Sequence, residues 1–153
     1  MGWLSLSKAL SALTHFSKRP FAEKRMLFQA AMALVRARCL LRFQSLEKLL
    51  SAPTEIDGKP NPQQRQKAMA VKGALSIIAR HLPGGASCLH QALAAHYLFH
   101  QHSIAGHLFV GFRLDQNGQA EGHAWVRHDD LIVCGAPVDG FVVASIHRIG
   151  RWA

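Results

Sequence analysis

The chain has 153 residues, of which 49% are hydrophobic, and its formal net charge is +9. This length fits one domain that can bury a core without disulfides, and the apolar content excludes wholesale disorder. Three cysteines, an odd number without regular spacing, argue against a disulfide scaffold and are typical of a reducing, cytoplasmic environment.

In chain order, the first half is basic and helical. Residues 1–82 hold 14 Lys and Arg against 4 Asp and Glu, whereas residues 83–153 hold 4 against 5. A basic half can meet nucleic acid, an anionic membrane surface or an acidic protein. Because the positive charge lies on alanine- and leucine-rich segments with few aromatic residues, we expect no nucleic acid. The chain start lacks the features of a signal peptide.

Periodic apolar residues predict helices over residues 3–16, 21–43 and 63–81. The segment 26–35 is very apolar, but Arg36, Arg38 and Arg42 interrupt it well short of the roughly 20 residues that a membrane span needs. A core helix and a helix at a membrane surface both fit this pattern, and in the first case Cys39 belongs to the core. Three prolines and a glycine predict a loop over 53–62.

The second half changes from helix to sheet. Leu-Pro-Gly-Gly-Ala cannot sit within a regular element, and a helix is expected to begin directly after it, at Ser87-Cys88. Strands are expected over 107–113, 123–127, 131–134 and 141–147, with an Asn-Gly hairpin turn between the first two. We therefore predict an α+β fold: a helical region at 1–81, packed on or docking for a core at 82–153 with one helix and an antiparallel sheet.

The strongest chemical signal is a cysteine at a helix start followed by a histidine on a strand. Ser87 is a suitable N-cap, so Cys88 occupies the first turn, where free amides and the helix dipole favour a thiolate. His123, 35 residues later, can act as its general base. Ten histidines raise the question of a metal, but Cys88-Leu89-His90 and the positions of His96, His100 and His102 lack paired zinc-site spacings, so we expect no metal.

Three segments also carry a family resemblance: Cys-Leu-His-Gln-Ala-Leu-Ala at 88–94, Leu-Phe-Val-Gly-Phe-Arg at 108–113 and His-Ala-Trp-Val at 123–126. Together they resemble the leader-peptidase part of lasso-peptide biosynthesis B proteins. The resemblance implies a transglutaminase-like cysteine peptidase that needs no cofactor and removes the leader of a ribosomally made precursor. It also implies three partners in the bacterial cytoplasm: the leader peptide, a leader-recognition protein and an asparagine-synthetase-like cyclase. Residues 1–50 are expected to meet these proteins or to touch the inner membrane face peripherally.

Residue by residue, the resemblance assigns Cys88 as nucleophile and His123 as base, but the third catalytic position departs from the family. The family aspartate is expected after the strand that follows the histidine, where this chain has Cys134-Gly135. Asp139 is our predicted replacement, and a backbone carbonyl, a water or no orienting group are the alternatives. Gln91 and Trp125 are predicted to line the substrate cleft. A thiol acyltransferase and a non-catalytic scaffold protein remain alternative functions.

Overall fold

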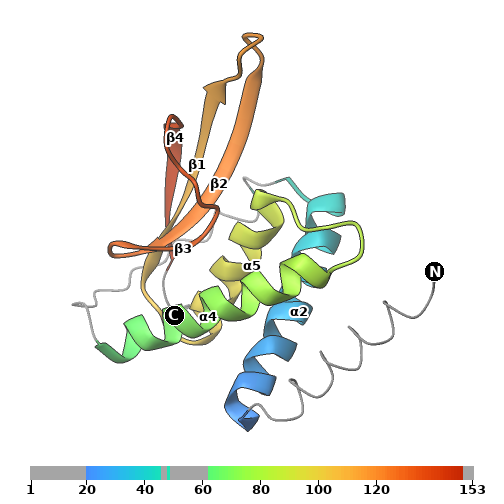
Figure 1. The fold of residues 1–153 in the computed structure, drawn as a ribbon, viewed down its shortest axis with the longest axis vertical. Coiled ribbons are helices and arrows are strands. Elements are labelled where there is room, and N and C mark those ends of the chain that lie inside the picture. The colour runs from blue at the N-terminus through green and yellow to red at the C-terminus, as the bar shows by residue number, and fades with distance from the viewer. Residues whose placement is uncertain (1–19, 46–47, 49–61, 150–153) are drawn as a thin grey trace, which may run out of the picture.

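The computed structural model describes residues 20–45, 48 and 62–149. Within them, three helices precede a sheet of four antiparallel strands (Figure 1). This arrangement confirms the predicted α+β class, with helices first and the sheet last. The helix expected over 3–16 lies outside the described residues, as does the loop expected over 53–62 except for its last residue. The division of the chain at residue 82 stays a prediction.

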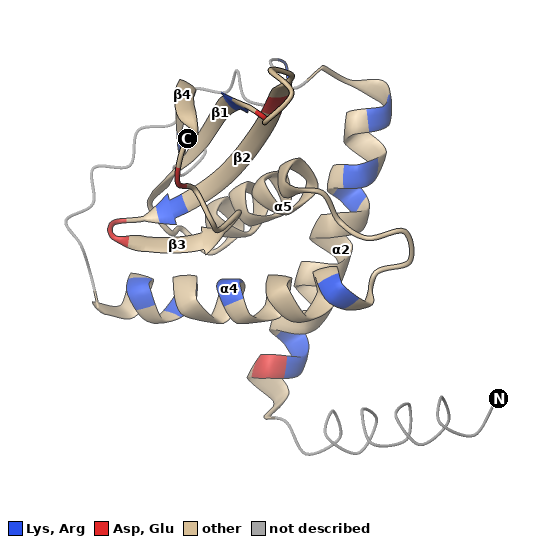
Figure 2. Ribbon diagram, turned by 45° about the horizontal axis from the view of Figure 1, so that its top comes forward, with Lys and Arg blue, Asp and Glu red and all other residues tan. Residues whose placement is uncertain are grey.

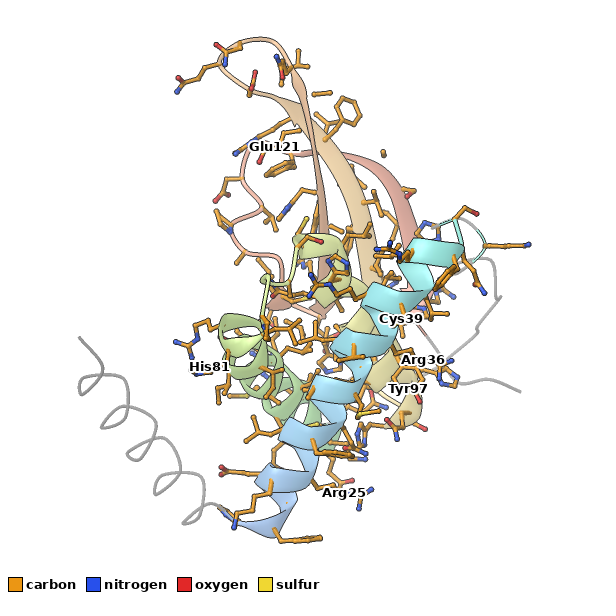
Figure 3. All side chains as sticks on the ribbon, turned by 90° about the vertical axis from the view of Figure 1, so that its right-hand side faces the viewer. Arg25, Arg36, Cys39, His81, Tyr97 and Glu121 are labelled. Atoms are coloured by element: carbon orange, nitrogen blue, oxygen red, sulfur yellow. The ribbon has the colours of Figure 1, made fainter. Side chains whose placement is uncertain are left out.

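Helix α2 (Phe21–Phe43) has the bounds that its sequence predicts. Three of its five buried side chains are alanines, which allows close helix packing. The buried residues are Leu27, Ala30, Ala33, Leu34 and Ala37. The opposite face is exposed, so only half of α2 belongs to the core. Cys39 lies on this outer side, and its prediction as a core residue was wrong because the helix buries a single stripe (Figure 3). No helix of the described residues is long and apolar enough to cross a membrane.

Helix α5 (Cys88–Gln101) is the centre of the fold and begins at the predicted residue. It packs against α2, against α4 (Pro62–His81) and against the sheet. Because neighbours surround it, α5 is buried on several sides through Ala92, Leu93, Ala94, Ala95, Leu98 and Phe99. Any side chain at its first turn is therefore held against several elements at once.

The sheet has the strand order β3-β2-β1-β4. Strands β1 (Gly106–Leu114) and β2 (Ala120–His128) form a long hairpin, and β3 (Leu131–Cys134) and β4 (Val142–Ile149) flank it. The predicted turn closes the hairpin, since Asp115 Oδ1 accepts hydrogen bonds of 2.8 Å from the amides of Asn117 and Gln119. The hairpin extends beyond the N-terminal end of α5 (Figure 1).

The strand registers determine which segments lie beside His123. His123 on β2 lies opposite Gly111 on β1, and Val126 lies opposite Cys134 on β3. Because side chains alternate along a strand, Ala124 and Val126 share one face of β2 and belong to the core, whereas His123 and Trp125 share the other face. The end of β3 thus lies beside the part of β2 that carries His123.

Candidate active site

The N-terminus of α5 is a tightly fixed helix start. Ser87 Oγ accepts a hydrogen bond of 3.3 Å from the His90 amide, and the Ser87 amide donates one of 3.3 Å to His90 Nδ1. This is a capping box in which histidine replaces the usual Glu or Gln. Gln91 Nε2 also donates to the Ala86 carbonyl at 2.9 Å. Cys88, which follows the cap and is partly buried, therefore has a well-defined position.

The turn before this helix is tied to α2. Gly84 and Gly85 adopt φ values of +77° and +68°, a conformation that other residues rarely take. Arg38 Nη1 donates a hydrogen bond of 2.8 Å to the Pro83 carbonyl. The two glycines that marked the helix boundary in the sequence thus have a backbone reason, and α2 helps to place Cys88.

His123 is oriented by the main chain of the segment that follows β3. Its Nε2 atom lies 2.6 Å from the Gly135 carbonyl oxygen. A carbonyl oxygen can only accept a hydrogen bond, so Nε2 must carry the proton. In the neutral ring Nδ1 is then unprotonated, and it is the atom that can take a proton from a thiol.

Aromatic rings fix the plane of His123. The Phe141 ring stacks on it with centroids 4.5 Å apart, and the buried Trp125 ring stacks at 5.8 Å. The Arg113 guanidinium lies over Phe141 at 4.4 Å and is itself paired with Glu121 across the hairpin at 2.7 Å. Trp125 is buried beside His123, and its predicted place in a substrate cleft stays a prediction. Sequence reasoning missed Phe141, since a single aromatic residue after a loop gives no signal of its partner.

Gly135 occupies a position that only glycine fits. Its φ is +82°, and a Cβ atom there would meet the Ala124 carbonyl oxygen at 2.4 Å and Trp125 Cβ at 2.7 Å. An aspartate at this position would therefore displace the strand that carries His123. The missing carboxylate thus has a steric explanation, and the Gly135 carbonyl is the hydrogen-bond partner that the structure gives to the ring instead.

Cys134 connects this region to the nucleophile. Burial, together with charge on the nearby Cys88 sulfur, raises the pKa of the Cys134 thiol to about 12. Cys134 is thus a protonated, packed side chain at neutral pH. Cys134 thus precedes the residue that bonds the His123 ring, and no hydrogen bond joins the Cys88 thiol to that ring in the part of the chain that the structure describes.

A cleft of about 290 Å³ opens beside these residues. Gln91 from α5 and Gly135 after β3 line it, together with residues of α4. Gln91 lies one turn after Cys88, so both are on the same side of α5. Gln91 thus lines this cleft, and its predicted role in binding a substrate stays a prediction.

The remaining predicted residue is Asp139, which is exposed in the segment between β3 and β4. Its role as the group that orients His123 stays a prediction. Within the described ranges, no three His, Cys, Asp or Glu side chains are grouped so that they could hold a metal ion.

Comparison with known proteins places this site in a family context. The model of the transglutaminase-like superfamily matches residues 31–145, about three quarters of the chain. The match contains most of α2, all of α4 and α5, and both Cys88 and His123. No curated protein and no solved structure matches the chain.

Proposed function

Because the chain belongs to the transglutaminase-like superfamily, we propose that it is a cysteine peptidase with Cys88 as nucleophile and His123 as general base. The observation that carries the proposal is the hydrogen bond between His123 Nε2 and the Gly135 carbonyl. That bond leaves the basic nitrogen, Nδ1, available for the thiol. The fixed start of α5 and the cleft beside it supply a nucleophile position and room for a substrate.

The proposed reaction has two halves. Nδ1 of His123 takes the thiol proton, and the Cys88 sulfur attacks the peptide carbonyl carbon. The free amides in the first turn of α5 can stabilise the oxyanion that forms. The imidazolium then protonates the leaving amine, and water, activated by the same nitrogen, hydrolyses the thioester and restores the thiol.

We further propose that the substrate is a lasso-peptide precursor and that cleavage separates its leader from its core. The motifs at 88–94, 108–113 and 123–126 support this narrower assignment through their resemblance to the leader-peptidase B proteins. In this proposal the enzyme works in the cytoplasm beside a leader-recognition protein and a cyclase. The basic helix α2, whose Lys and Arg positions are coloured blue in Figure 2, is the proposed surface for these partners or for a peripheral membrane contact.

The test uses the cognate precursor peptide, which this proposal takes as the substrate. We expect Cys88→Ala and His123→Ala each to abolish its cleavage, whereas Cys39→Ala, which removes the exposed cysteine of α2, should cleave as the wild type does. Mass spectrometry of the products distinguishes hydrolysis from transfer to an amine. Cleavage at the wild-type rate by Cys88→Ala would overturn the proposal.

A further inference from the structure

The cleft beside the candidate nucleophile is positively charged. Helix α4 contributes Lys72, Ser76 and Arg80, which recur every fourth residue and so form one line along the helix. The opposite wall consists of Gln91, Val133, Cys134 and Gly135. None of the described residues that line this cleft is acidic, so its two formal charges are both positive.

On the α4 side of the cleft, the Arg80 side chain is held by a hydrogen bond. Arg80 Nε donates a hydrogen bond of 3.1 Å to the Ser76 carbonyl, which directs the guanidinium along α4. The terminal nitrogens of the guanidinium stay available as donors, and a guanidinium fork matches the two oxygens of a carboxylate. Figure 2 marks the basic positions of α4 in blue on the ribbon, and α4 contacts β3, the strand that ends in this cleft.

The position of the cleft relates these charges to the chemistry. Gly135 holds the His123 ring through its carbonyl, and Gln91 follows Cys88 by one turn of α5. The cleft therefore shares Gly135 with the hydrogen bond that orients His123, and its Gln91 lies one helical turn from Cys88. Clefts of one charge sign concentrate ligands of the opposite sign.

We propose that this cleft is a specificity subsite for a carboxylate, and that the substrate carries an acidic side chain next to the scissile bond. This inference rests on the proposed function for its substrate, but it concerns a property of the cleft that can be measured without the precursor. Lys72 and Arg80 are its specificity-determining residues, and Gln91 and Ser76 supply neutral donors.

The experiment compares two alkylating reagents of nearly equal size, iodoacetate and iodoacetamide, in a Cys39→Ser background. In both reactions the Cys88 sulfur forms a bond to carbon and iodide leaves, so the reagents differ in charge alone. We expect the rate ratio of iodoacetate to iodoacetamide at Cys88 to fall about tenfold in the double variant Lys72→Gln/Arg80→Gln. Peptide mapping assigns the modification to Cys88.

The matched control is Arg42→Gln/Lys67→Gln, which removes the same two charges from helix positions that do not line the cleft. An equal fall in this control, or no fall in the cleft variant, would overturn the subsite. Neither of these results would contradict the proposed peptidase function. Failure of Cys88 to react with either reagent would instead overturn the proposed function.

A second arm identifies the source of the carboxylate. N-acetylglutamate α-amide and N-acetylglutamine are isomers, with the carboxylate on the side chain in the first and at the chain end in the second. We expect the first isomer to protect Cys88 from iodoacetamide and the second to protect it much less. Protection by N-acetylglutamine alone would overturn the assignment of an internal acidic residue.

Discussion

The His123 ring donates its Nε2 proton to the Gly135 carbonyl oxygen, 2.6 Å away. This bond joins the middle of β2 to the residue directly after β3, and it determines which ring nitrogen can act as a base. A carbonyl is neutral, so it stabilises the imidazolium less than a carboxylate would. His123 is consequently oriented by a neutral group, where a catalytic triad has a carboxylate.

Gly135→Ala tests this arrangement. The new Cβ would meet the Ala124 carbonyl at 2.4 Å in a backbone with φ of +82°. We expect a loss of about 2–4 kcal/mol in the free energy of unfolding and of most precursor cleavage. Urea unfolding and a cleavage assay measure the two effects.

Gly140→Ala is the matched control for that variant. Gly140 has a φ of +79°, but nothing lies within 4 Å of its added Cβ. It should therefore lose only about 1–2 kcal/mol and keep its cleavage rate. Equal losses of cleavage in both variants would mean that backbone strain, not the position of the carbonyl, sets the activity.

Asp139→Asn separates the predicted carboxylate from the carbonyl. Because the Gly135 carbonyl accepts the Nε2 proton, we expect this variant to retain at least about half of the wild-type cleavage rate. Steady-state kinetics on the precursor check it. A loss as large as that of His123→Ala would instead identify Asp139 as the orienting group.

The three cysteines should differ in their reaction with iodoacetamide at pH 7.5. Cys39 is exposed and Cys88 is partly exposed, whereas Cys134 is buried and its pKa is raised to about 12. We expect label on Cys39 and Cys88 in the native protein, and on Cys134 only after denaturation. Label on native Cys134 would contradict the packed, protonated state described above.

Folding stability should fall in mild acid because of His96. Burial lowers the pKa of His96 from 6.5 to about 4, with a contribution from the neighbouring His100 and His147. Between pH 6.5 and about 4, His96 is therefore protonated in the unfolded chain but neutral in the folded chain. The free energy of unfolding should decrease as the pH falls from 6.5 to about 4, by roughly 3 kcal/mol from this group.

Urea titrations at pH 7 and pH 5 measure this effect. His96→Gln should reduce the difference between the two titrations, whereas Met69→Gln, at an exposed position of α4 without a titratable group, should leave it unchanged. Some acid sensitivity should remain in both, because burial also lowers the pKa values of His90, His100, His102 and His107. An unchanged difference in His96→Gln would contradict the prediction.

Much of the fold followed from local sequence patterns. The bounds of α2 and the start of α5 are as predicted, because proline, glycine and an N-cap serine determine where a helix can begin. The strands are each at most a few residues longer or shifted. Alternation and the Asn-Gly turn fix the hairpin within one short stretch of chain, so no distant contact was needed to predict it.

Features that depend on contacts between distant segments were not predictable. The orienting carbonyl depends on the register of β3 against β2 and on the backbone conformation of Gly135, neither of which a residue type reveals. The stacking of Phe141 on His123 depends on the backbone path of the segment before β4. Cys39 was misplaced because an apolar helix does not reveal from its composition which of its faces meets the core.

The main-chain acceptor at position 135 also has a genetic consequence. Every amino acid has a backbone carbonyl, so no missense change deletes this group. A substitution can only move it by distorting the backbone around it. An alanine scan would report the strain of Gly135→Ala and miss the hydrogen bond that the strain disturbs. Chemical ligation can weaken the acceptor directly, by exchanging the amide between Gly135 and Ala136 for an ester whose carbonyl is a poorer acceptor.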